Sequence, residues 1–141
     1  PLHLSYDKLN NLSEKELEEL RANLLQFNES ETNPAAKELS NAYVYLVDVC
    51  IYRKKMLETQ AQLSAVSNPC NSLDKFDLLT QYKEKLLEST KNYLEKVDSF
   101  VSHNPDKATE LELQKGADPI ELEETVKKHK ELVEQLKEVC K

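Results

Sequence analysis

The sequence predicts an all-α protein: an antiparallel three- to four-helix bundle with a long central helical hairpin and a heptad-like helix at the C-terminal end. Only one of the 141 residues is glycine, whereas ordinary proteins contain about 7%, and the tight turns of β-hairpins depend on glycine. Charged residues make up 32% of the chain, as is usual for long amphipathic helices with charged outer faces. Apolar residues recur at spacings of three and four, which is the period of one helix face.

We expect the chain to form one domain, and helix-start signals mark the successive helices within it. Ser13 with Glu16 three residues later forms a capping-box pattern, and Asn33 before Pro34 is an N-cap residue followed by a proline at the first helical position. These signals and the apolar spacing predict, within residues 1–141, a lead-in at 1–12, helices at 14–27, 34–66 and 72–101, a short helix at 105–115 and a helix at 119–140. A short turn rich in Ser, Asn and Pro joins the two longest helices, which implies that they run antiparallel.

The last predicted helix, 119–140, carries a heptad-like seam that includes Val133 and Leu136. It follows Gly116, which falls where a left-handed residue would end the short helix before it. The seam is too short to indicate an independent coiled coil. We expect it to pack on the bundle or to contact a partner.

Residues 39–57 are the most apolar part of the chain, and Asp48 alone interrupts the apolar and aromatic run at their centre. In a helix, these side chains point in nearly all directions, so one neighbouring helix cannot cover them. Because the helix at 14–27 is short, we expect a partner protein to complete the cover. The alternative is that 34–66 is simply the buried central helix of the bundle. The residues expected to bind the partner are Leu46, Val47, Val49, Ile51 and Tyr52 in this helix, with Val133 and Leu136 in the last one.

A basic cluster follows the apolar run at Arg53, Lys54 and Lys55. Such a cluster can contact anionic lipid headgroups or an acidic partner, although lipid-binding clusters usually hold more basic residues. This gives an alternative function, a membrane-proximal trafficking module that contacts anionic lipid or a helical partner. The simpler interpretation is that these side chains pair with glutamates of neighbouring helices.

Charge and composition argue against several classes of protein. The net charge of −7 and the lack of a long basic stripe disfavour binding to nucleic acid. No run of about 18 apolar residues is present to span a membrane, and the first residues lack the features of a signal peptide. Since the chain begins with proline, we expect an excised fragment or a processed product.

The potential ligands and nucleophiles are scattered along the chain. The three histidines and three cysteines show no short metal-ligand spacing, so no metal and no cofactor is expected. Cys70 is the single candidate nucleophile, because it lies in a predicted loop before a helix, but no base can be assigned to it. Cys50 is expected in the core. His129 lies on the seam, where a packed histidine is a simpler interpretation than a pH switch. An odd number of widely spaced cysteines does not indicate a disulfide framework, and it favours a reducing compartment.

The sequence therefore predicts a non-catalytic helical protein–protein interaction module, a scaffold or adaptor subunit of an intracellular complex in the cytoplasm or nucleus. Its protein partners would bind through 34–66 and 119–140, and self-association is kept as an alternative. We expect Val47→Glu or Ile51→Glu to abolish partner binding while helical circular dichroism survives.

Overall fold

A computed structural model describes residues 4–108 and 118–141. Over these ranges the chain is helical and contains no strand, which confirms the all-α class. The elements are, in chain order, α1 (Tyr6–Asn10), α2 (Glu14–Ser30), α3 (Pro34–Ser64), the 3-10 turn η1 (Pro69–Ser72), α4 (Leu73–His103), the 3-10 turn η2 (Pro105–Lys107) and α6 (Pro119–Val139).

The predicted starts of α2, α3 and α6 agree with the structure, and each is capped by a nearby side chain. The Ser13 hydroxyl accepts a hydrogen bond from the Glu16 backbone at 3.1 Å, and the Glu16 carboxylate accepts one from the Ser13 backbone at 3.0 Å. The Asn33 side chain caps α3 through the Ala36 backbone N–H. These side chains satisfy backbone donors that have no partner within the helix.

Several predicted ends and short elements differ from the structure. Helix α2 continues to Ser30, three residues beyond the expected end. The next proline, Pro34, disfavours the helical conformation only for the residue before it, Asn33, so it does not stop the helix earlier. The lead-in contains the short helix α1, whose Leu9 is 1% exposed. Of the short helix expected at 105–115, the described part begins with the turn η2 (Pro105–Lys107). Residues 109–115, and Gly116 after them, lie outside the described residues.

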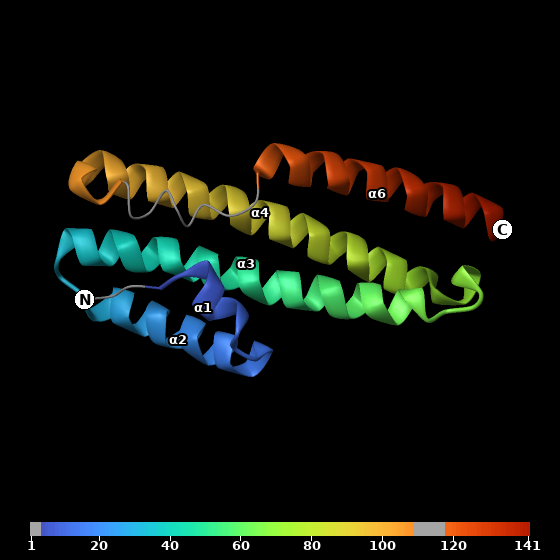
Figure 1. Cartoon of the computed structure of the whole chain (residues 1–141), viewed down its shortest axis with the longest axis horizontal. Helices are drawn as coiled ribbons and strands as arrows, with labels where there is room; N and C mark the ends of the chain where they lie inside the picture. The colour runs from blue at the N-terminus through green and yellow to red at the C-terminus, as the bar shows by residue number, and fades with distance from the viewer. Residues whose placement is uncertain (1–3, 109–117) are drawn as a thin grey trace.

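The centre of the molecule is the antiparallel hairpin of α3 and α4 (Figure 1). Helix α2 packs along the first part of α3. Helix α6 runs back along the first part of α4 (Figure 1). Each long helix thus packs mainly on its neighbour in the sequence, and α2 and α6 lie toward opposite ends of the hairpin on opposite sides of it.

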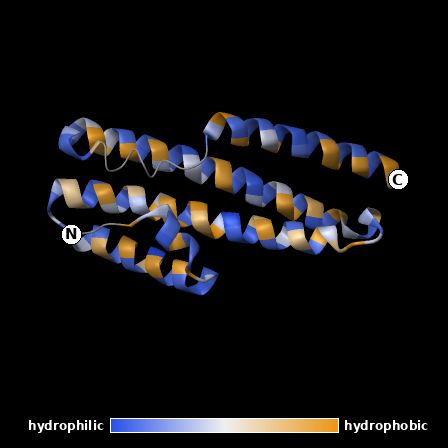
Figure 2. Ribbon diagram, viewed as in Figure 1, coloured by the Kyte–Doolittle hydropathy of each residue, from blue (hydrophilic) through white to orange (hydrophobic). Residues whose placement is uncertain are grey.

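The buried apolar side chains form one main cluster, and a smaller set lies outside it. The main core is a cluster shared by α1, α2, α3 and the last part of α4, and its fully enclosed side chains include Tyr43, Val47 and Val97. Five further apolar side chains are buried outside that cluster: Val49 of α3, Leu79 and Leu86 of α4, and Val126 and Val133 of α6. Figure 2 shows hydrophobic residues recurring along every long helix, with hydrophilic residues between them. Helix α6 buries two valines where α2 buries two leucines, so less apolar surface is buried by α6 than by α2.

Candidate functional site

The apolar run of residues 39–57 is covered mainly by the chain's own helices. Val47 is fully buried, and Leu46, Ile51 and Val49 are 2%, 6% and 9% exposed. The expectation that a partner must cover these four side chains is therefore wrong, and the alternative of a buried central helix holds for them. Tyr52 is only half-buried.

Two features that the sequence did not reveal provide this cover. Helix α2 is longer than expected, and α1 adds a leucine to the cluster. The side chains that pack on this part of α3 are Leu9 of α1, Leu17 and Leu24 of α2, and Tyr93, Val97 and Phe100 of α4. A short helix inside a lead-in of mixed polarity gives a weak signal, although Ser5 does have the N-cap residue type.

Asp48, the charged residue within the apolar run, is satisfied by α2. Its two carboxylate oxygens accept hydrogen bonds from the Arg21 Nε at 2.6 Å and from an Arg21 terminal nitrogen at 3.3 Å. The hydrogen bond to Asp48 raises the pKa of Arg21. This two-point contact fixes the register of α2 on α3, because a guanidinium and a carboxylate match in geometry.

The basic cluster ties the N-terminal helices to α3. Arg53 donates to the Tyr6 hydroxyl at 2.6 Å and lies over the Tyr6 ring, while Lys54 donates to the Asn10 carbonyl at 3.1 Å. Lys55 pairs with Glu14 at the start of α2, and this hydrogen bond raises the pKa of Lys55. All three cations are thus engaged within the chain. The simpler interpretation, pairing with glutamates of neighbouring helices, holds for Lys55, whereas Arg53 and Lys54 bind a tyrosine and a backbone carbonyl instead. Lipid binding gains no support from these contacts.

Helix α6 buries one face on α4. Val126 and Val133 are each 6% exposed, and Leu136 is half-buried. Around these apolar contacts lie three ion pairs between α4 and α6: Lys91 with Glu123, Glu84 with Lys130, and Asp77 with Lys137. All six side chains are roughly half-exposed, so the pairs contribute little to stability. Of the predicted partner-binding residues on α6, Val133 is therefore occupied by α4.

A histidine of α6 and a lysine of α4 lie near one another within this packing. The Nε2 atom of His129 is buried and has no hydrogen-bond partner among residues 4–108 and 118–141. The Lys83 side chain of α4 lies close enough to repel a protonated imidazole. Burial lowers the pKa of His129, and the charge of Lys83 lowers it further, while a hydrogen bond to the Phe76 backbone opposes both effects. Burial also lowers the pKa of Lys83. The neutral imidazole is the form that suits this interface.

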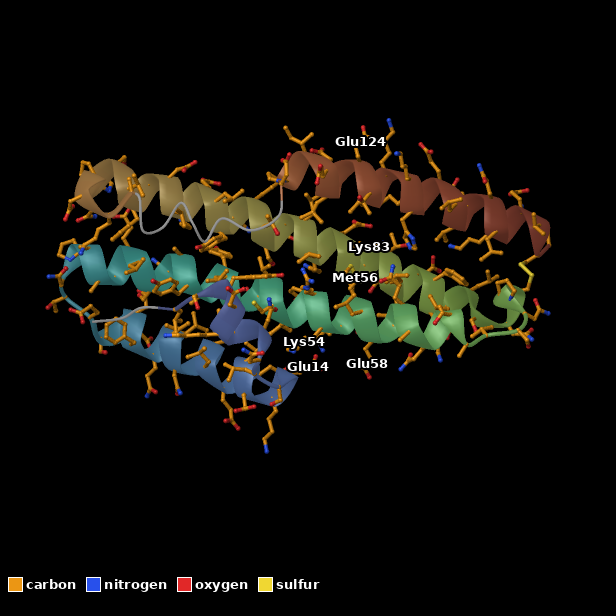
Figure 3. All side chains as sticks on the ribbon, in the orientation of Figure 1. Glu14, Lys54, Met56, Glu58, Lys83 and Glu124 are labelled. Carbon is orange, nitrogen blue, oxygen red and sulfur yellow. A yellow bond between two sulfur atoms is a disulfide. The ribbon has the colours of Figure 1, made fainter. Side chains whose placement is uncertain are left out.

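Cys70 and Cys140 form a disulfide that fastens the end of α6 to the turn η1, where the Cα atoms are 5.5 Å apart (Figure 3). This corrects two expectations, the absence of disulfide pairing and the candidacy of Cys70 as a nucleophile, since a bonded sulfur offers no thiolate. The remaining cysteine, Cys50, is in the core as expected, and burial raises its pKa to about 11. The pairing was hidden because it joins residues 70 positions apart.

Toward its C-terminal end, α6 carries two apolar side chains that are largely exposed in the part of the chain that the structure describes. Leu132 is 63% exposed and Val139 is 81% exposed. Leu132, Leu136 and Val139 are spaced at i, i+4 and i+7, so they form one stripe along the helix, in which Leu136 is half-buried at the edge of the α4 interface. We call these three residues the α6 stripe. It contains one predicted partner-binding residue, Leu136.

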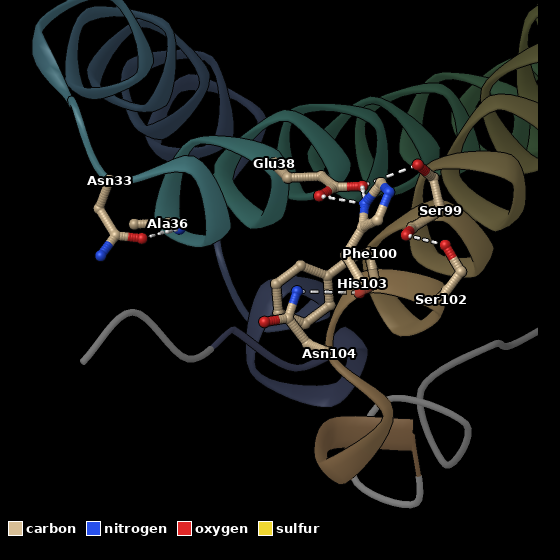
Figure 4. A network of polar contacts seen from close by, with 8 residues as sticks. All are labelled: Asn33, Ala36, Glu38, Ser99, Phe100, Ser102, His103 and Asn104. Carbon is tan, nitrogen blue, oxygen red and sulfur yellow. Dashed lines mark hydrogen bonds and ion pairs between the residues drawn. The ribbon is translucent and has the colours of Figure 1, made fainter.

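A polar cluster links the first part of α3 to the end of α4 (Figure 4). The Glu38 carboxylate accepts a hydrogen bond from the Ser99 hydroxyl at 2.7 Å and lies 3.0 Å from the His103 Nδ1. The hydrogen bond from Ser99 lowers the pKa of Glu38. Because Ser99 donates to the carboxylate and not to the imidazole, this is not the arrangement that activates a serine nucleophile. An open pocket of about 480 Å³ lies beside the cluster. The contacts within the cluster serve to hold α3 and α4 together.

Among residues 4–108 and 118–141, no group of three or more His, Cys, Asp or Glu side chains is placed to hold a metal ion. Over the same residues, no helix has the length and apolar character needed to cross a membrane. Comparison with known proteins gives no match: no family model fits the sequence, and neither a curated protein nor a solved structure matches it.

Proposed function

We propose that this chain is a non-catalytic helical protein–protein interaction module, a scaffold or adaptor subunit whose partner binds the α6 stripe. The working unit would be an antiparallel three- to four-helix bundle in which the α3–α4 hairpin serves as the support. One observation carries the proposal: α6 already buries Val126 and Val133 on α4, yet it keeps Leu132 and Val139 well exposed on another face.

The spacing of the stripe indicates the kind of partner. Apolar anchors at i, i+4 and i+7 are the pattern by which an amphipathic helix enters an apolar groove or pairs with another helix. The partner would therefore present a groove or a helix with an apolar face. The disulfide at Cys140 holds this end of α6 in place, which reduces the conformational entropy lost on binding.

The compartment proposed here differs from the one predicted from the sequence. The intracellular expectation drew on the odd, widely spaced cysteines and on the lack of signal-peptide features, and the Cys70–Cys140 bond removes the first of these supports. Disulfides persist mainly in oxidising environments and are rare in the cytosol and nucleus. We therefore place the module in an oxidising compartment.

Site-specific photo-crosslinking on the full chain tests the proposal. A photoreactive amino acid is introduced at Leu132, and the matched control is Leu57 of α3, an exposed leucine at 47% that lies outside the stripe. In the cells that produce the protein, we expect a discrete adduct from position 132 that Val139→Glu abolishes. An adduct of twice the chain mass would identify a second copy as the partner. Equal yields from both positions, or none from position 132, would refute the proposal.

A further inference from the structure

The sequence contains the pattern Asn-x-Ser twice, at Asn11-Leu12-Ser13 and at Asn28-Glu29-Ser30. This pattern, with any residue except proline in the middle, is the acceptor for N-linked glycans in proteins that enter the secretory pathway. By itself it is a weak signal, because it also occurs in proteins that never meet the transferring enzyme. The Cys70–Cys140 disulfide adds an independent observation, since it indicates the oxidising environment in which such transfer occurs.

The two asparagines differ in exposure and in their hydrogen bonds. Asn11 is exposed and lies after the last residue of α1, in the link that leads to the start of α2. Ser13, the third residue of this pattern, is also exposed. The Asn11 side-chain nitrogen makes a single hydrogen bond, to the Asp7 carbonyl at 3.2 Å. One amide hydrogen therefore remains for that bond after a sugar replaces the other.

Asn28 cannot carry a glycan in this fold. It lies inside α2, is 9% exposed, and its side-chain nitrogen donates both to the Lys37 carbonyl and to the Asn41 side chain of α3. A sugar on that nitrogen would remove one of the two donors and would have to occupy the α2–α3 interface. A chain modified there would lose part of the contact that holds the end of α2 on α3.

We propose that Asn11 is an N-glycan attachment site and that Asn28 remains unmodified in the folded protein. The glycan donor would be a lipid-linked oligosaccharide diphosphate. The bond between the sugar C1 and the phosphate oxygen breaks, and C1 forms a bond to the Asn11 Nδ2. The amide loses one proton, and the lipid diphosphate leaves. No oxidation or reduction is involved.

The position of Asn11 is compatible with the proposed partner surface without depending on it. The α1–α2 link and α6 lie on opposite sides of the α3–α4 hairpin (Figure 1). A glycan at Asn11 would therefore leave the α6 stripe free. This inference and the interaction proposal share the oxidising compartment, but each has its own readout, so either can fail alone.

Peptide mapping of the full chain tests the assignment. The protein is isolated from its natural source, and in parallel it is secreted from cultured eukaryotic cells behind a cleavable signal sequence. Enzymatic removal of N-glycans in ¹⁸O water converts a glycosylated asparagine into a labelled aspartate. We expect the label at Asn11 in both preparations, and we expect none at Asn28.

Substitutions separate the acceptor pattern from effects on folding. Asn11→Gln should remove the whole glycan mass, whereas Asn28→Gln should leave it unchanged. Ser13→Thr is the matched control for Ser13→Ala: both alter the N-cap of α2, but threonine keeps the acceptor pattern and the capping oxygen, so the glycan should persist only with threonine. Unlabelled Asn11 in the natural protein, or labelled Asn28 in protein with native helical circular dichroism, would overturn the proposal.

Discussion

The disulfide between Cys70 and Cys140 should decide whether α6 stays docked on α4. The bond closes a sequence separation of 70 residues, for which the chain-entropy relation gives about 4 kcal/mol of stabilisation. The apolar packing under α6 comes chiefly from Val126 and Val133, at about 1.5–3 kcal/mol for each buried side chain. The tether is thus comparable to all of this packing, which must also offset the entropy of ordering a 21-residue helix.

We therefore expect Cys140→Ser to release α6 while the rest of the molecule stays folded. Hydrogen exchange followed by mass spectrometry is the appropriate assay, because it measures local opening helix by helix. If the whole tether energy acts on α6, its amides should exchange roughly a thousand times faster in the variant, since each 1.4 kcal/mol corresponds to a factor of ten. The amides of α3 around Val47, in the separate main core, should change little.

Two controls accompany this measurement. Cys70→Ser should match Cys140→Ser, because either change removes the same bond. A reductant should accelerate exchange in the wild-type protein but have no further effect on the variants. If α6 exchanges as slowly in Cys140→Ser as in the oxidised wild-type protein, then its packing on α4 is sufficient by itself and the reasoning is refuted.

Three other predictions concern the core, the α4–α6 interface and the α2–α3 ion pair. Val47→Glu should unfold the chain, because an unpaired carboxylate at a fully buried position costs several kcal/mol; a helical circular dichroism melt like that of wild type would contradict this. The pKa of His129 lies below its ordinary value of 6.5, so its contribution to stability is complete above pH 6.5 and is lost as the pH falls through the lowered pKa. Urea unfolding at a series of pH values should therefore show a shallower acid loss for His129→Gln, and identical pH slopes would disprove the assignment. Asp48→Asn should lower the free energy of unfolding, measured in urea, by about 1–2 kcal/mol, because it weakens the two-point contact with Arg21. Arg21→Lys should lower it by a similar amount, because lysine cannot make the same contact. A loss of zero would show that the contact is not stabilising.

Local sequence patterns were sufficient to predict the fold class and where the long helices begin. The capping box of Ser13 and Glu16 and the Asn33 cap each involve atoms within three residues of one another. Such contacts form wherever the segment is placed, so the sequence reports them directly. Helix ends were predicted less well, as the extension of α2 to Ser30 shows, because no glycine marks the stop.

The candidate site depended on contacts that no local pattern contains. The apolar run of α3 looks uncovered in the sequence, and only the arrangement of α1, α2 and α4 around it shows that Leu46 and Val47 are enclosed. Likewise, Arg53 resembles a surface cation until Tyr6 is placed beside it. Side-chain exposure is a property of the whole packing, so it cannot be read from one helix alone.

The sequence by itself therefore determined that this protein is a set of amphipathic helices with defined starting points. The tertiary structure alone decided which apolar faces remain open, and it narrowed the proposed partner surface, which the sequence placed on both α3 and α6, to Leu132, Leu136 and Val139 of α6. It alone also paired Cys70 with Cys140. The physical reason is the distance along the chain: helix caps act across three or four residues, whereas burial and disulfide pairing depend on how helices far apart in the sequence meet in space.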